Sequence, residues 1–328
     1  MKTAMQTYVL RDVLGNKDIP ETYTFECHAD VGNPYVPKSN PTYQFQKELL
    51  RDMVAFLLDP QGDALFLSGP TGSGKTSAIL EFAARFNWPV QNVTARGHME
   101  FSDLVGHHTL MSEKPGEPAV MKFEYGPLAK AMALGHIFIL NEADLIDPSE
   151  LSGLNDILDG RPLVVEANGG KVIKPHPLFR FVATGNSRGS GDESGIYSGV
   201  VTQNLAAMDR YRMLLVDYPS RDVELDILAN VAPEIPEELR GHMIDLANDI
   251  RTKFKGVDGD RQLNVTLSTR KLIQWAKVWL QYRGAPNPAQ MAFDVVLLNR
   301  CNDEEFEAIN RSAELIFNQT LWPARERK

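Results

Sequence analysis

The sequence has little cysteine, and that scarcity argues against several classes of protein. Among its 328 residues only Cys27 and Cys301 are cysteines, and they stand far apart with no CxxC spacing. A disulfide framework or a cysteine-rich zinc site is therefore not expected. A long apolar run is also missing, because none reaches the roughly 18 residues of a membrane-spanning helix. The N-terminal segment becomes polar too early for a secretory signal, so we expect a cytoplasmic protein.

The chain also lacks an excess of positive charge. Lysine and arginine total 34 against 43 for aspartate and glutamate, which gives a net charge of -9. Sequence-independent binding to nucleic acid needs a basic surface, so this balance argues against a nucleic-acid motor such as a helicase loader. Hydrophobic residues make up 43% and charged residues 23%, which is typical of a globular protein.

Strand and helix patterns alternate through the middle of the chain. Residues 1–40 have no clear period and are interpreted as an N-terminal extension. Residues 41–219 alternate amphipathic helices with apolar strands, which predicts an α/β fold with a parallel sheet covered on both faces. The expected strands lie at 64–69, 89–93, 136–141, 178–186 and 213–219. A Gly169–Gly170 turn predicts a hairpin at about 162–175. Residues 220–328 show helical periods, which predicts a smaller α-helical domain.

One motif is specific enough to indicate a ligand. Residues 69-GPTGSGKT-76 fit GxxxxGK[ST] at every required place, after a predicted strand and at the start of a predicted helix. Glycines let backbone N–H groups surround phosphates, and the helix N-terminus adds positive potential. We therefore predict ATP and Mg2+ as ligands, with Lys75 on the β- and γ-phosphates and the Thr76 hydroxyl on the metal. The predicted nucleotide-binding residues are Gly69, Pro70, Thr71, Gly72, Ser73, Gly74, Lys75, Thr76 and Ser77.

The strand at 136–141 ends in an unusual pair of residues. A phosphate-loop ATPase usually has Asp-Glu here, whereas this chain has Asn141-Glu142. Glu142 stands where the general base that polarises water belongs. Asn141 has the shape of aspartate and can bond a magnesium-bound water, but it lacks the charge, so we expect weaker magnesium binding and slower turnover. The alternative is that Asn141 abolishes hydrolysis and leaves a nucleotide-gated scaffold.

Polar residues further along the chain complete the predicted catalytic set. Asn186 ends a strand and can sense the γ-phosphate, and Arg210 is predicted as an arginine finger that a neighbouring subunit can receive. Arg212 is either a helper of that finger or only a surface ion-pair partner. Arg270 lies in the first turn of a helix and would fold onto the nucleotide. The predicted catalytic residues are Glu142, Asn186, Arg210 and Arg270, and the predicted metal ligands are Thr76 and, through water, Asn141.

In this order, these residues resemble those of the AAA+ ATPases and, within them, of the MoxR branch. The segments 103-DLVG-106 and 123-FEYGPLAKAM-132 look like the helix-2 insertion of that branch. The segments 172-VIKPHPLFRFVATGNSRGSGDESGIYSG-199, 203-QNLAAMDRYRM-213 and 34-NPYVPKSNPTYQFQKEL-49 resemble the small, ATPase subunits of aerobic cobaltochelatases. The likeness covers most of the chain up to about residue 220, and the remainder more loosely. Asn141 departs from the family pattern, which mostly has aspartate.

The resemblance implies an organisation beyond one chain. It implies a P-loop AAA+ three-layer sandwich over 41–219, followed by a helical lid domain over 220–328. It also implies a ring, commonly a homo-hexamer, with ATP between subunits and Arg210 acting on the next one. An insertion at about 103–126 and the hairpin at about 162–175 would act on a client protein or metalloenzyme complex, often with a partner that carries a von Willebrand factor A domain. The resemblance leaves the client and the pathway open.

Overall fold

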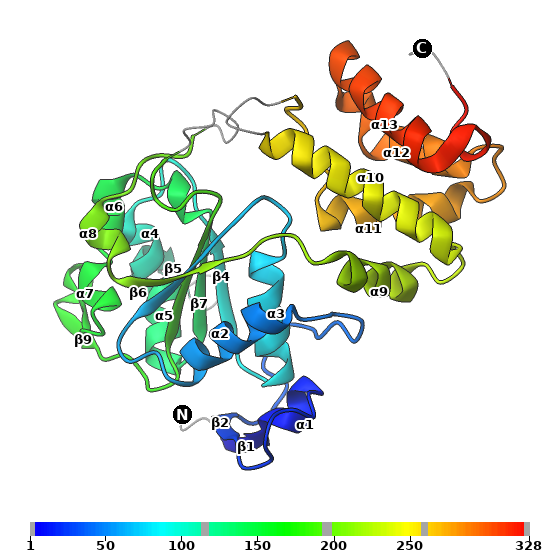
Figure 1. The fold of residues 1–328 in the computed structure, drawn as a ribbon. Helices are drawn as coiled ribbons and strands as arrows, with labels where there is room; N and C mark the ends of the chain where they lie inside the picture. The colour runs from blue at the N-terminus through cyan, green and yellow to red at the C-terminus, as the bar shows by residue number, and fades with distance from the viewer. Residues whose placement is uncertain (1–3, 113–117, 192–198, 257–261, 325–328) are drawn as a thin grey trace. The chain divides into compact units, whose positions relative to one another are not determined.

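The fold is that of a computed structural model, which describes residues 4–112, 118–191, 199–256 and 262–324. The chain divides into two compact units (Figure 1). Unit 1 comprises Met1–Asn40, Lys47–Gly69 and Lys75–Val216, and unit 2 comprises Pro41–Gln46, Pro70–Gly74 and Asp217–Lys328. The longest stretch of unit 2 begins at Asp217, and the tip of the glycine-rich loop also belongs to this unit.

A five-stranded parallel sheet forms the centre of unit 1 and confirms the predicted α/β fold. Its strand order is β11-β3-β10-β7-β4. The strands are β3 (Ala64–Ser68), β4 (Val90–Thr94), β7 (Ile137–Asn141), β10 (Arg180–Gly185) and β11 (Tyr211–Leu215). Gly185 pairs with Ser68, and Thr94 pairs with Asn141. The carboxyl ends of these strands therefore meet at one edge, where parallel sheets of this kind usually bind ligands.

The three central strands β3, β7 and β10 are buried on both faces, as their continuous apolar sequences predict. Alternate residues of β3 point to opposite faces, and Ala64, Leu65, Phe66 and Leu67 are each at most 2% exposed. The helices of unit 1 include α3 and α5, which both contact β7 (Figure 1). The α-helices of unit 1 are α1 (Leu10–Leu14), α2 (Lys47–Leu58), α3 (Lys75–Arg85), α4 (Phe101–Val105), α5 (Pro127–Leu134), α6 (Pro148–Ser152), α7 (Asn155–Leu158) and α8 (Leu205–Met208).

Two antiparallel hairpins extend from unit 1. One pairs β5 (Gly106–Met111) with β6 (Val120–Tyr125) within the segment that resembles the helix-2 insertion, of which residues 113–117 lie outside the described ranges. The other pairs β8 (Leu163–Val165) with β9 (Lys171–Ile173). The Gly169–Gly170 turn between them follows a single 3-10 turn, and both glycines have positive φ. The apolar side chains on these hairpins include Leu110 and Met121, which are 70% and 67% exposed.

The N-terminal extension forms ordered structure that its sequence pattern did not indicate. Strands β1 (Met5–Val9) and β2 (Thr24–His28) pair in antiparallel register. The rings of Tyr8 and Phe25 pack on Phe86 at centroid distances of 5.8 and 6.1 Å. Strands of five residues are too short to show a reliable alternation, so their stability comes from these aromatic contacts with the end of α3 rather than from a local period.

Unit 2 contains a helical bundle with its own apolar core (Figure 1). Trp275, Trp322 and Phe317 are fully buried there, and their rings contact one another. The α-helices are α9 (Arg221–Val231), α10 (Glu237–Lys255), α11 (Thr269–Tyr282), α12 (Pro288–Val296) and α13 (Asp303–Leu321). The sequence pattern indicated the first four of these, whereas α13 was missed. Within the described ranges, no helix combines the length and apolarity that crossing a membrane requires.

Candidate functional site

The loop between β3 and α3 has the backbone conformation of a phosphate cradle. β3 ends at Ser68 and α3 begins at Lys75, so residues 69–74 form the whole connection. Gly72 and Gly74 have φ of 74° and 97°, a region that residues with a side chain rarely adopt. The first N–H groups of an eleven-residue helix lack intrahelical acceptors and carry positive potential. The loop and the helix start are therefore suited to a polyphosphate.

Gly72 has a second reason to be glycine, and it lies within unit 2. A Cβ on Gly72 would come within 2.5 Å of both Cβ and Oγ of Ser268 and within 3.9 Å of the Cβ of Arg270. Ser268 caps α11 by accepting a hydrogen bond from the N–H of Lys271 at 3.3 Å. The tip of the loop thus packs on the start of α11, next to the exposed Arg270.

The contacts of Lys75 at the carboxyl edge of the sheet include two neutral oxygens. Its Nζ donates to the carbonyl of Gly69 at 2.5 Å and to Oδ1 of Asn186 at 3.1 Å, and the residue is only 9% exposed. An ammonium group at the start of α3, directly after the glycine-rich loop, is suited to a phosphate ligand. The structure therefore brings two predicted site residues together across 111 positions of sequence.

Thr76 and Asn141 also meet directly. The Thr76 hydroxyl donates to Oδ1 of Asn141 at 2.6 Å. This bond occupies the hydroxyl proton and leaves the oxygen lone pairs of Thr76 for another ligand. The Nδ2 of Asn141 donates to the side-chain oxygen of Asn92 and to the carbonyl of Val93 at 3.1 Å. The hydroxyl oxygen of Thr76 and the amide oxygen of Asn141, both on predicted metal ligands, thus lie side by side.

Glu142 directly follows β7 in a strained backbone conformation. Its φ is 54° and its ψ 41°, which is the left-handed region that glutamate seldom adopts. Such strain often marks a functional position, because the surrounding structure must enforce it. Here the N–H of Glu142 donates to the Thr184 hydroxyl on the adjacent strand at 3.3 Å. The side chain is exposed at the carboxyl edge, so water can reach it.

Asp144 is a site residue that sequence reasoning missed. It is fully buried, and its Oδ2 accepts from the N–H groups of Asn186 and Ser187 at 2.7 and 3.0 Å. The carboxylate therefore fixes the turn that presents Asn186 to Lys75. Asp144 lies three residues after Asn141, in the pattern Asn-Glu-Ala-Asp, but nothing in that spacing showed a partner 42 residues away.

Arg210 lies at the amino ends of the parallel strands, whereas the phosphate loop follows the carboxyl end of β3. It precedes β11, whose first residue Tyr211 pairs with Ala64 at the start of β3. Five residues of strand span about 16 Å, so Arg210 is far from the loop that follows β3. Its guanidinium instead bonds Asp159, at 2.7 and 3.4 Å, and the carbonyl of Ala206 at 2.6 Å. The predicted arginine finger cannot serve the loop of its own chain in this position.

Arg212 has bonds that account for its presence on structural grounds. Its Nε donates to Asp63 at 2.6 Å, and its terminal nitrogens donate to the carbonyls of Pro60 at 2.8 Å and Asp59 at 3.4 Å. These groups belong to the turn between α2 and β3. Of the two alternatives for Arg212, the contacts favour the surface ion pair.

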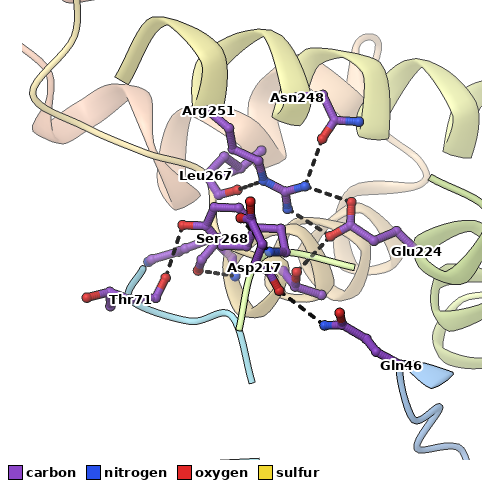
Figure 2. Close-up of polar contacts among 11 residues, drawn as sticks. Gln46, Thr71, Asp217, Glu224, Asn248, Arg251, Leu267 and Ser268 are labelled. Carbon is purple, nitrogen blue, oxygen red and sulfur yellow. Dashed lines mark hydrogen bonds and ion pairs between the residues drawn. The ribbon is translucent and has the colours of Figure 1, made fainter. Parts of the chain in front are cut away.

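A buried polar cluster joins α9, α10 and the segment just before α11 in unit 2 (Figure 2). Arg251 and Glu224 form two parallel bonds of 2.8 Å, and their side chains are 5% and 0% exposed. Arg251 also donates to the Leu267 carbonyl at 2.8 Å, which holds the residue before the Ser268 cap. The guanidinium lies 4.2 Å from the centroid of the Tyr218 ring, whose hydroxyl donates to the carbonyl of Thr71 at 3.1 Å.

The chemistry of these groups fits a nucleotide with magnesium. Hydroxyl and amide oxygens, as in Thr76 and Asn141, are ligand types that Mg2+ or its bound waters accept. The hydroxyl of Ser73 is buried with no partner among the described residues, and it belongs to the loop that would surround the phosphates. Elsewhere in the described ranges, no group of three histidine, cysteine, aspartate or glutamate side chains could hold a metal ion.

Comparison with protein families gives two matches along the chain. Residues 64–198 match the family described as AAA domain (dynein-related subfamily). Residues 224–314 match the family described as CbbQ/NirQ/NorQ C-terminal. The first match contains the phosphate loop, Asn141, Glu142 and Asn186, and the second contains Arg251 and Arg270.

Individual proteins are similar over most of their length. Aerobic cobaltochelatase subunit CobS of Sinorhizobium sp. is 30% identical over 279 residues, which are 84% of this chain and 80% of that protein. An uncharacterized protein of Staphylococcus aureus (strain USA300) is 29% identical over 259 residues, covering 77% of this chain and 90% of its own length. Among solved structures, the RuvB Holliday junction branch migration motor of Thermotoga maritima has a TM-score of 0.50 and 12% identity, covering 86% of this chain and 80% of its own. That structure is similar in fold.

Proposed function

The chain belongs to the MoxR branch of the AAA+ ATPases, in the group similar to CobS, and on this premise we propose that it binds ATP with Mg2+ and hydrolyses it in a homo-oligomeric ring. The observation that carries the proposal is the pair of contacts at one sheet edge. Lys75 bonds Asn186, and Thr76 bonds Asn141, so four predicted site residues from three strand ends converge there.

Each of these residues has a role that follows from its chemistry. The loop N–H groups and Lys75 bind the β- and γ-phosphates, and the oxygens of Thr76 and Asn141 hold Mg2+, the latter through water. The metal supplies charge neutralisation of the phosphates when it is bound. Glu142 accepts the proton of the attacking water, and Asn186, held by Asp144, orients that water.

The position of Arg210 supports a site shared between subunits. Because Arg210 lies at the amino edge of the sheet, its charge can reach a γ-phosphate only on another chain. Arg270 instead lies beside Gly72 of its own chain, where it can follow the lid toward the nucleotide. A hexameric ring is the arrangement that we propose, with Arg210 acting on the next protomer.

We further propose that the ring remodels or matures a client protein or metalloenzyme complex. The β5–β6 and β8–β9 hairpins carry exposed apolar side chains, which include Leu110, Met121 and Val164. Such side chains suit contact with another protein. A partner with a von Willebrand factor A domain is proposed from the family resemblance. We place the motor in the cytoplasm, where ATP is available and where its two buried cysteines would stay reduced.

The second candidate function is a nucleotide-gated scaffold with little hydrolysis. The neutral Asn141 amide favours it, because a missing carboxylate weakens the hold on magnesium. Brisk turnover by the natural chain would remove this candidate. Assembly with ATP but phosphate release near background would support it.

Magnesium-dependent phosphate release by the purified chain tests the proposal. Lys75→Ala should abolish ATP binding and release, whereas Glu142→Gln should keep binding and lower the rate by about a hundredfold or more. Arg210→Ala should assemble but hydrolyse ATP slowly. Mixing it with Glu142→Gln should restore part of the activity, because some interfaces then pair an intact Glu142 with an intact Arg210. An Arg210→Ala ring with unchanged activity would contradict the shared site. A wild-type chain that neither binds nor hydrolyses ATP would overturn the proposal as a whole.

A further inference from the structure

We propose that Asn92 is a positioning residue for the metal side of this site, because it holds the Asn141 amide with its oxygen toward Thr76. This inference rests on the proposed function, since it concerns the same magnesium–nucleotide site. Asn92 lies on β4, outside the motifs that predicted the site. Its role follows from strand register, which the sequence does not display.

The register places Asn92 diagonally across from Asn141. Thr94 of β4 pairs with Asn141 of β7, and Asn92 lies two residues before Thr94. Residues two apart on a strand face the same side, and diagonal neighbours on adjacent strands are within reach of each other. The structure accordingly shows Nδ2 of Asn141 donating to Oδ1 of Asn92. β4 is the edge strand of the five-stranded sheet.

The Val93 carbonyl decides which way round the Asn141 amide lies. A carbonyl can only accept, so the end of the amide that lies 3.1 Å from the Val93 oxygen must be the nitrogen. With one N–H on Val93 and the other on Asn92, both donors of the amide are used. The oxygen then faces Thr76 and accepts its hydroxyl at 2.6 Å. One lone pair of that oxygen remains for a magnesium-bound water.

Asn92 makes this orientation specific. Without it, one N–H of Asn141 would lose its acceptor, and rotation of the amide would be less costly. The same geometry explains why an aspartate at 141 is not a simple replacement. A carboxylate oxygen would then lie near the Val93 carbonyl, and Asn92 would have to turn its own amide to donate to it. Asn92 and Asn141 therefore form a matched pair.

Binding of ATP across a magnesium titration tests this role without using turnover. Asn92→Leu removes the acceptor without changing the charge, at an exposed position where the substitution leaves the core intact. Magnesium should tighten ATP binding, and we measure the magnesium concentration at which this effect is half complete. We expect Asn92→Leu to raise that concentration by about two- to tenfold, which is the range of one hydrogen bond. Binding of ATP in EDTA should not change. Thr94→Val, exposed on the same strand, is the matched control and should behave as wild type.

A double-mutant cycle separates positioning from a general effect on β4. In an Asn141→Ala background there is no amide to hold, so adding Asn92→Leu should change the magnesium dependence no further. An equal shift in both backgrounds, or no shift from Asn92→Leu alone, would overturn the inference while ATP binding by the wild type upholds the proposed function. If the wild type binds ATP no better than Lys75→Ala, the proposed function itself fails, and this inference fails with it.

Discussion

Each unit contains a buried cation, and the two cations differ in where they stand. In unit 2, Arg251 and Glu224 are buried and neutralise each other through two 2.8 Å bonds. In unit 1, the contacts of the buried Lys75 include the Gly69 carbonyl and Oδ1 of Asn186, and the residue directly follows the glycine-rich loop. The two charges of a buried ion pair compensate each other, and removing one partner leaves the other charge uncompensated. Arg251 therefore serves the packing of unit 2, whereas Lys75 stands at a loop whose N–H groups suit a polyphosphate.

The largest expected effect comes from removing a positive charge in each unit. Arg251→Met leaves Glu224 buried and unpaired, so the free energy of unfolding should fall by about 3–5 kcal/mol. Lys75→Met should lower it less, because residues of ligand-binding sites are generally not optimised for stability. Urea unfolding followed by tryptophan fluorescence measures both, since Trp88 belongs to unit 1 and the other three tryptophans belong to unit 2.

A double variant tests whether the stranded charge of Glu224 causes the loss of stability. Replacing both partners, in Glu224→Leu with Arg251→Met, removes the stranded charge and should recover part of the lost stability. If Lys75→Met destabilises the chain as strongly as Arg251→Met does, the contrast between a structural and a ligand-binding cation is wrong.

The next largest effect concerns buried groups in unit 1 that must stay neutral. Burial, with the nearby charges of His28 and His176, lowers the pKa of His136 from 6.5 to about 4. The folded chain therefore binds fewer protons than the unfolded chain between these values. Stability should be complete above pH 6.5 and should fall by about 3 kcal/mol as the pH drops toward 4.

Equilibrium unfolding at several pH values, followed through Trp88, measures this dependence. Trp88 is fully buried and bonds the Gly135 carbonyl, which His28 also contacts. His136→Gln should flatten the curve between pH 6.5 and 4. His107→Gln changes an exposed histidine and should leave the curve as it is. A wild-type curve that rises with acid would show that the sign is wrong.

The smallest expected effect distinguishes two neighbouring arginines. Arg212→Gln removes a partly exposed ion pair with Asp63 and should cost about 1 kcal/mol of unfolding free energy. Its rate of ATP hydrolysis should equal that of the wild type, in contrast to Arg210→Ala. A large loss of hydrolysis in Arg212→Gln, with the ring intact, would instead make Arg212 a helper of the finger.

Contiguous features of this chain could be predicted, and features set by register could not. The phosphate loop lies within eight consecutive residues, so its strand, glycines and helix start are all visible together. Glu142 and Asn186 follow strand ends, which the parallel-sheet prediction places at one edge. Asn92 and Asp144 escaped prediction, because their roles depend on partners 49 and 42 residues away. A periodic pattern among neighbouring residues does not reveal contacts between residues so far apart in the sequence.

The ordered N-terminal extension was missed for a related reason. Its two strands are held by Tyr8 and Phe25 against Phe86, and not by an amphipathic pattern of their own. Helix α13 was missed although it opens with a capping box at Asn302 and Glu305. That signal stands directly after the last predicted helix, and the periodicity alone did not separate a further helix from it.

The ion pair between Arg210 and Asp159 means that the proposed finger has a competing anion on its own chain. Its guanidinium already holds a carboxylate at 2.7 Å. A phosphate on an adjoining chain must therefore displace one anion with another, and docking becomes an exchange rather than a simple capture.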